Sequence, residues 1–294
     1  MFADDIINDA MLPTLYRDFH KIQMLIGRAQ KFALARDFAL AADGLVDNID
    51  ELKRIAPFCR IPYPITWIEF AQSDRKHWME SSMHFPTVQA APANIAFLCV
   101  AKDPKDMTSW TTLLMWSFKN QRQTYNASVI AIDINLNGKA DSNFPAEGLE
   151  PYVMARSAPF APPLIGLTSD ETKKLIEVLS SDWGGEVRYL FAVLGLLNAQ
   201  NVPVSTRTDL SKLNKARARR GHRQLQDHTV LTIRATHKAS LLPPRASSTE
   251  RGTEIRASFI RGHFKHRKTG IFWWNPHLRG NRKRGFVDKD YTIT

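Results

Sequence analysis

The stretch IAFLCVAKDPKDMTSWTTLLMWSF, residues 95–118, contains two runs rich in β-branched and aromatic residues, 95–100 and 110–118, with Asp and Pro between them. Similar runs occupy residues 66–70 and 127–134. Short runs of this composition, bounded by Pro, Asp or Asn, are typical of β-strands. They predict a mainly antiparallel sheet of about four strands.

The residues that precede this sheet have a helical pattern. Between residues 4 and 54, apolar side chains recur mostly at intervals of three and four, the period of one helix face. Pro13 and Gly44 interrupt the pattern. We therefore expect two or three N-terminal helices rather than one long helix.

The residues that follow the sheet predict a second region. Four prolines mark residues 151–168 as a linker or long surface loop. Beyond it, the patterns predict helices at 172–180 and 186–200, and strands at 202–207, 228–234 and 255–264. The predicted fold class is α+β, with N-terminal helices and a mainly antiparallel sheet in residues 1–150, and two helices and a basic β-rich part in residues 169–294.

Composition limits the class of protein. A chain of 294 residues with 44% hydrophobic residues can bury a sizeable core. Cys59 and Cys99 form no C-x-x-C pair, so we expect neither a disulfide framework nor a thiolate zinc site. The N-terminus carries acids where a secretory signal would carry Lys or Arg, and no apolar run approaches the roughly 20 residues that span a bilayer. We expect a soluble, cytoplasmic protein without a metal, a cofactor or a membrane partner.

The charge is unevenly distributed along the chain. Residues 207–294 hold 21 of the 40 Lys and Arg but only 6 of the 29 Asp and Glu, so the whole net charge of +11 arises there. A basic segment attached to a mildly acidic body is typical of proteins that contact nucleic acid or another polyanion. A solvated basic surface without a partner is the alternative.

One concentration of charge is the segment KLNKARARRGH, residues 212–222, which predicts a short helix ending near Gly221. Its five cations are Lys212, Lys215, Arg217, Arg219 and Arg220. Such a helix can neutralise several phosphates at once, with affinity that falls steeply with salt and without reading a base sequence. The alternative is an exposed connector, but a solubilising helix would usually include acids, and this segment has none.

A second concentration is FIRGHFKHRKTGIFWWNPHLRG, residues 259–280, which predicts a β-hairpin with Lys268-Thr269-Gly270 at its tip. Because neighbouring residues of a strand face opposite sides, we expect one of Trp273 and Trp274 in the core and the other at the surface. The exposed indole would stack on an unpaired base or pack under Lys and Arg side chains. Phe264 and Phe272 are expected in the core.

Six of the nine histidines lie in the basic region. The similar surroundings of His263, in RGH, and His277, in PHLRG, predict that these two side chains lie on neighbouring strands. Two imidazoles suffice for metal-free acid/base chemistry on RNA. Phosphate contact and structural hydrogen bonding are the alternatives.

Several common enzyme motifs are absent. The chain has no P-loop, no G-x-G-x-x-G, no H-E-x-x-H and no G-x-S-x-G, so nucleotide hydrolysis, dinucleotide chemistry and common hydrolase classes lack their usual residues. Asp133 to Gly138 has the first half of a calcium-loop spacing, but Phe144 stands where the loop requires its closing Glu. A hairpin turn is the expected structure there.

Two stretches resemble a known family. LNKARARRGHRQLQDHTVLTI, residues 213–233, and RGHFKHRKTGIFWWNPHLRG, residues 261–280, continuing into GFVDKDYTI, residues 285–293, are similar to uncharacterised proteins encoded by tailed phages and prophages of proteobacteria. IPYPITWIEF, residues 61–70, resembles them more loosely. This chain has Gln224-Leu225 where the family usually has Pro-Leu. The resemblance implies a phage origin and a bacterial cytoplasm, and it carries over no catalytic residue.

These observations predict a non-enzymatic, phage-encoded nucleic-acid-binding protein. The expected contact residues are Lys212, Lys215, Arg217, Arg219, Arg220, Arg261, Lys265, Arg267, Lys268, Trp274 and Arg279. One alternative is a small metal-independent nuclease that uses His263 and His277. Another is a protein that binds and inhibits a host factor.

Overall fold

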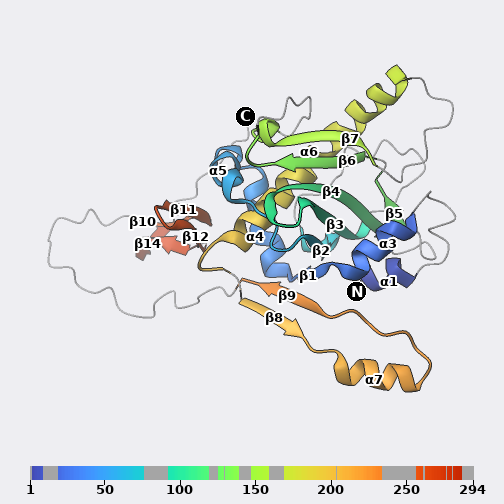
Figure 1. The fold of residues 1–294 in the computed structure, drawn as a ribbon. Coiled ribbons are helices and arrows are strands. Elements are labelled where there is room, and N and C mark those ends of the chain that lie inside the picture. Colours follow the sequence, from blue (N-terminus) through green and yellow to red (C-terminus); the bar gives the residue numbers. More distant parts are fainter. Residues whose placement is uncertain are drawn as a thin grey trace.

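The computed structural model describes residues 2–8, 19–75, 92–118, 125–128, 130–138, 147–158, 169–202, 204–233, 256–260, 262–275, 277–279 and 281–286. At its centre is a nine-stranded sheet with the strand order β7-β6-β4-β3-β2-β1-β9-β8, to which β5 adds beside β4 (Figure 1). Its strands are β1 Gln30–Leu34, β2 Ile65–Ala71, β3 Pro92–Asp103, β4 Asp106–Phe118, β5 Tyr125–Ala127, β6 Ile130–Asn135, β7 Val153–Ser157, β8 Val204–Thr208 and β9 His228–Thr232.

Helices cover both faces of this sheet. The described helices are α1 Phe2–Asn8, α3 Phe19–Arg28, α4 Arg36–Val46, α5 Ile49–Ile55, α6 Ser169–Asn198 and α7 Ser211–Arg219, with 3-10 turns η1 Ala56–Phe58, η2 Gln72–Asp74 and η3 Glu150–Tyr152. One core lies between the sheet and α4, α5 and α6, and a second lies between the sheet and α1 and α3. Within the described residues, no helix is both long and apolar enough to cross a bilayer.

The two cores explain the apolar runs of the central strands. Trp67 and Leu98 belong to the core beneath α1 and α3, whereas their neighbours Ile68 and Phe97 belong to the core beneath α6. Because both faces of β2, β3 and β4 are buried, successive residues are apolar instead of alternating with polar ones. The predicted α+β class is confirmed, and the stretch 95–118 forms the antiparallel pair β3 and β4.

The sheet is larger than expected and includes parallel pairs. β1 lies within the region predicted to be entirely helical, and it pairs parallel to both β2 and β9. β8 and β9 come from the region predicted as a separate C-terminal part, yet they extend the same sheet beyond β1. Strands from both residues 1–150 and residues 169–294 therefore belong to the same large sheet.

Regular secondary structure continues through two places where the sequence predicted an interruption. The two helices predicted around Gly184 and Gly185 are one helix, α6, which runs through both glycines. Each glycine costs about 1 kcal/mol in a helix, but the buried residues from Val187 to Leu196 outweigh this cost. The predicted linker is wrong for residues 151–157, which form part of η3 and the strand β7 paired with β6. Residues 159–168 lie outside the described part.

A charged cluster is buried where α4 and α6 meet the end of η2. Arg75 donates through Nη1 to both carboxylate oxygens of Glu186, each at 2.8 Å, and through Nε to Asp43 at 3.3 Å. All three side chains are almost fully buried. The guanidinium also lies 4.1 Å from the ring centroid of Tyr189. This charge cluster, Asp43, Arg75 and Glu186, joins three elements far apart in the sequence.

The C-terminal residues form two small sheets beside α5 and the end of α6. β11 His263–Arg267 and β12 Gly270–Trp274 make the predicted hairpin, with Gly270 at φ +129°. β10 Arg256–Ile260, β13 His277–Arg279 and β14 Asn281–Phe286 form a three-stranded sheet in the order β13-β10-β14. The single strand predicted at 255–264 is therefore two strands, β10 and β11.

Candidate nucleic-acid interface

Residues 204–232 form an arm that extends from the body of the described structure. β8 and β9 pair antiparallel at the edge of the large sheet, and α7 lies at the far end of the arm, away from the sheet (Figure 1). The expected short basic helix is thus present, and it ends before Gly221, whose φ of +69° suits a helix C-terminus.

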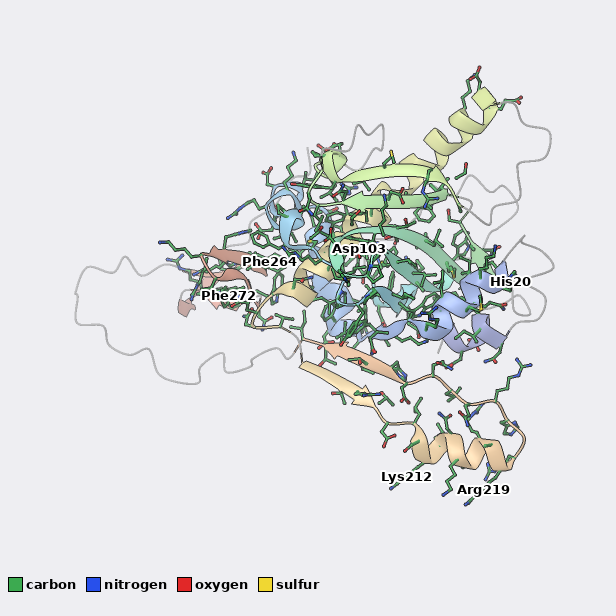
Figure 2. The ribbon with its side chains drawn as sticks, in the orientation of Figure 1. His20, Asp103, Lys212, Arg219, Phe264 and Phe272 are labelled. Carbon is green, nitrogen blue, oxygen red and sulfur yellow. The ribbon has the colours of Figure 1, made fainter. Side chains whose placement is uncertain are left out.

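α7 is a helix that packs none of its residues into a core. None of its side chains is buried, and even Leu213 is 47% exposed. Lys212, Lys215 and Arg219 follow one another at three- and four-residue intervals, so they share one side of the helix. Figure 2 shows Lys212 and Arg219 pointing away from the sheet. α7 itself contains no acidic residue, although Asp227 of the segment that returns to β9 lines a hollow together with Lys215 and Arg219.

Polar side chains hold α7 against the segment that returns to β9. Asn214 donates to the carbonyl of Leu225 at 2.8 Å and accepts from the Leu225 amide at 2.7 Å. Arg217 donates through Nε to the carbonyl of Arg223 at 2.8 Å. Arg217 therefore positions the helix, whereas Lys212, Lys215, Arg219 and Arg220 have exposed side chains. An open hollow between α7 and the returning segment is lined by Ser211, Asn214, Lys215, Ala218, Arg219, Gln224 and Asp227.

The arm is tied to the body through α1. Arg223 donates to the carbonyl of Asn8 at 2.8 Å, and the amide of Gln226 donates to the buried carboxylate of Asp4 at 2.8 Å. α1 is fixed in turn by Glu69, whose carboxylate accepts hydrogen bonds from the first two amides of the helix. Burial raises the pKa of Glu69. These contacts hold α7 in a defined place although it buries nothing itself.

The second basic surface is the outer face of the hairpin, which consists of His263, Lys265, Arg267, Phe272 and Trp274. Strand pairing places His263 opposite Trp274 and Lys265 opposite Phe272, so these side chains share one face. Lys265 Nζ lies 3.4 Å from the ring centroid of Trp274, and the guanidinium carbon of Arg267 lies 5.0 Å from that of Phe272. Each aromatic ring of this face therefore carries a cation over it.

The inner face of the hairpin packs into the core that lies between the large sheet and α4, α5 and α6. Phe264, Ile271 and Trp273 are buried there. The prediction that one tryptophan is buried and the other exposed is confirmed, with Trp274 at 39% exposure. The expected core position of Phe272 is wrong, because alternation along β12 places it on the outer face with Trp274. A register derived from the predicted turn at Lys268-Thr269 would have indicated this.

Hydrogen bonds fix the hairpin to the body on both strands. Asn201, just beyond α6, accepts from the Trp273 amide at 2.7 Å and donates to its carbonyl at 2.6 Å. The carboxylate of Glu51 accepts from the Phe264 amide at 2.9 Å. The side-chain amide of Gln200 donates to the carbonyl of Thr269 at the tip. The outer face is therefore displayed on a fixed support.

Replacing Asn201 by Ala is expected to loosen this support. Both backbone groups of Trp273 would lose their partner, at a cost of about 1–3 kcal/mol in the free energy of unfolding. Urea denaturation measures this cost, and hydrogen exchange of the Trp273 amide should become faster while amides in β3 keep their protection. Unchanged exchange at Trp273 would show that Asn201 does not fix the hairpin.

The predicted pairing of His263 with His277 is wrong. His263 lies opposite Trp274 on β11, whereas His277 lies opposite Ile260 on β13, a strand of another sheet. Both imidazole rings contact the Trp274 indole instead, with centroid distances of 6.0 and 6.4 Å. The Nδ1 atom of His277 also hydrogen-bonds with the carbonyl of Asn275 at 3.1 Å. Backbone pairing therefore does not align the two histidines as a catalytic pair.

The two basic surfaces occupy different parts of the molecule. Figure 2 shows Phe264 and Phe272 in the hairpin well away from Lys212 and Arg219 in α7. The continuous C-terminal surface implied by the charge distribution is thus divided in two. Lys268 is exposed at the hairpin tip and Arg279 is exposed on β13. Arg261 lies outside the described residues.

Among the described residues, no group of three or more His, Cys, Asp or Glu side chains is arranged to hold a metal ion. The carboxylate of Asp133, from the calcium-like motif, accepts from Arg156 Nε at 2.9 Å and from Thr111 at 2.6 Å. Asn135 accepts from the amides of Asn137 and Gly138, as expected of a turn. Comparison of the chain with protein-family models, curated proteins and solved structures found no match.

Proposed function

We propose that this protein binds nucleic acid, and that α7 is its main contact with the phosphate backbone. The observation that carries the proposal is a helix that contains cations and no acid of its own, buries none of its residues, and is held at the end of an arm. A polyanion is the ligand complementary to such a surface.

The energetics of α7 favour a binding role over a structural one. A helix of nine residues is marginal in water on its own, and most helices in proteins are stabilised by burying an apolar face. α7 lacks such a face and depends on side chains such as Asn214 and Arg217 to hold it. The fold thus maintains an ordered basic helix that contributes nothing to a core.

The outer face of the hairpin supplies further positive charge. Lys265, Arg267 and Lys268 lie on or beside it, and the aromatic rings among them offer flat surfaces as well as charge. We assign the hairpin a second contact with the same polymer. A nuclease activity of His263 and His277 is not part of the proposal, because the two residues lie in different sheets.

The resemblance to phage-encoded proteins supports placing this function in a bacterial cytoplasm. The two stretches that carry the resemblance, residues 213–233 and 261–293, include most of α7 and the whole hairpin. The features that resemble the family therefore coincide with the two basic surfaces. We propose that the polymer is bacterial or phage nucleic acid.

Fluorescence anisotropy of labelled single-stranded DNA, duplex DNA and RNA tests the proposal. Sequence-independent binding through phosphates has dissociation constants of about 1–100 μM at physiological salt and is much tighter at low salt. We expect at least one polymer to bind in this range. Absence of binding to all three at low salt would contradict the proposal. Retention of a host protein after nuclease treatment of an immobilised sample would favour a protein partner instead.

A further inference from the structure

We propose that the outer face of the hairpin binds unpaired bases, so that the preferred polymer contains single-stranded nucleic acid. This inference rests on the proposed function and names the form of its ligand. Trp274 is the stacking surface, and Lys265 and Arg267 contact phosphates beside the stacked base.

The first support is the arrangement of cations and rings. Proteins that bind single strands combine aromatic side chains, on which bases stack, with positive charge along the backbone path. On the outer face, Trp274 and Phe272 are in one row of β12, and Lys265 and Arg267 are in the adjacent row of β11. Because β11 and β12 are neighbouring strands, one nucleotide can contact a ring with its base and a cation with its phosphate.

The second support is the position of Lys265. Its ammonium group lies 3.4 Å from the centroid of the Trp274 ring, so it occupies a face of the indole in the unbound protein. A cation over an exposed ring is held by only about 0.5–1 kcal/mol, which is less than base stacking contributes. A base can therefore displace the ammonium group, which remains close enough to meet the adjoining phosphate.

The third support is the rigid platform under Trp274. Its neighbour Trp273 is buried, and Asn201 forms hydrogen bonds with both the amide and the carbonyl of Trp273. On the other strand, Glu51 holds the amide of Phe264. A side chain carried by a fixed backbone loses little conformational freedom when a ligand binds. The hairpin is thus preorganised for stacking, although Trp274 itself is exposed.

The geometry selects unpaired bases over duplex. In a duplex both faces of each base are covered by its neighbours, and an aromatic side chain gains access only by unstacking them at a cost of a few kcal/mol. A single strand presents its base faces without that cost. α7, which offers charge alone, contacts phosphates of either form.

The test compares Trp274→Ala with Trp274→Phe on oligothymidylate and on a duplex of equal length, using anisotropy. Since stacking contributes 1–3 kcal/mol per base, Trp274→Ala is expected to weaken single-strand binding about 5- to 150-fold. Trp274→Phe should retain most of the affinity, because phenylalanine still offers a ring. Duplex binding should change less than about twofold in either variant. Equal thermal midpoints of the variants and the wild type establish that the fold is retained.

Three other outcomes have distinct meanings. If Trp274→Ala leaves single-strand binding unchanged, or weakens duplex equally, the proposal is overturned while phosphate binding by α7 stands. If the wild type binds duplex but not single-stranded DNA, the stacking proposal is likewise overturned and phosphate binding by α7 stands. If neither polymer binds at low salt, the proposed function fails together with this inference. Photocross-linking of oligothymidylate gives an independent readout, and mapping the cross-link to Trp274 is the expected result.

Discussion

Replacing Lys212, Lys215 and Arg219 together by alanine is expected to weaken nucleic-acid binding about a hundredfold at physiological salt. Each phosphate contact to duplex contributes about −0.9 to the slope of log K against log salt concentration. Three such contacts therefore raise the binding constant about a hundredfold between 1 M and 0.15 M salt. Their loss should also make the slope shallower by about 3. Anisotropy over a salt series measures both quantities.

The matched control removes equal charge elsewhere. Arg36, Lys105 and Lys174 are exposed residues outside the arm and the hairpin. Their joint replacement by alanine lowers the net charge by the same amount but should change affinity only severalfold, through the long-range field of the protein. Equal losses in the two triple variants would show that net charge, rather than α7, determines binding.

Replacing Arg75 by alanine is expected to have the largest effect on stability. The variant would remove the guanidinium that contacts the buried carboxylates of both Asp43 and Glu186. Breaking a buried ion pair by removing one partner costs about 3–5 kcal/mol. Urea or thermal denaturation measures this loss. The triple variant in which Asp43 and Glu186 also become Asn and Gln should recover much of it, because the two groups that contacted Arg75 are then neutral.

A surface ion pair provides the comparison for Arg75. Arg207 contacts Asp227 at 3.8 Å, and the two side chains are 78% and 53% exposed. Replacing Arg207 by alanine should cost less than about 1 kcal/mol, since exposed pairs are screened by water. If the Arg75 variant were as stable as the Arg207 variant, the charge cluster would not hold α4, α6 and the end of η2 together.

Local patterns in the sequence predicted the elements whose structure depends on near neighbours. β3 and β4 follow from the runs in residues 95–118, and α7 follows from a segment that ends at Gly221. The hairpin follows from its turn at Lys268-Thr269 and from alternation along β12. In each case residues close in sequence decide the outcome, through strand alternation, turn chemistry or helix termination.

The predictions that were wrong concern elements whose structure depends on residues far away in the sequence. β1 has the apolar spacing of a helix but becomes a strand because it is enclosed between β2 and β9. α6 continues through Gly184 and Gly185 because of the core that its second half enters. Likewise, the separation of His263 from His277 depends on β13 pairing with β10. Local propensity is a weak guide where tertiary contacts decide.

The affinity of the intact protein for nucleic acid across a salt series shows whether the basic surfaces contact phosphates. The four exposed cations Lys212, Lys215, Arg219 and Arg220, with or without those of the hairpin, predict a slope of log K against log salt between about −3 and −6. Binding at low salt with such a slope would support phosphate contact by these surfaces. No binding at low salt, or binding whose strength does not depend on salt, would contradict it.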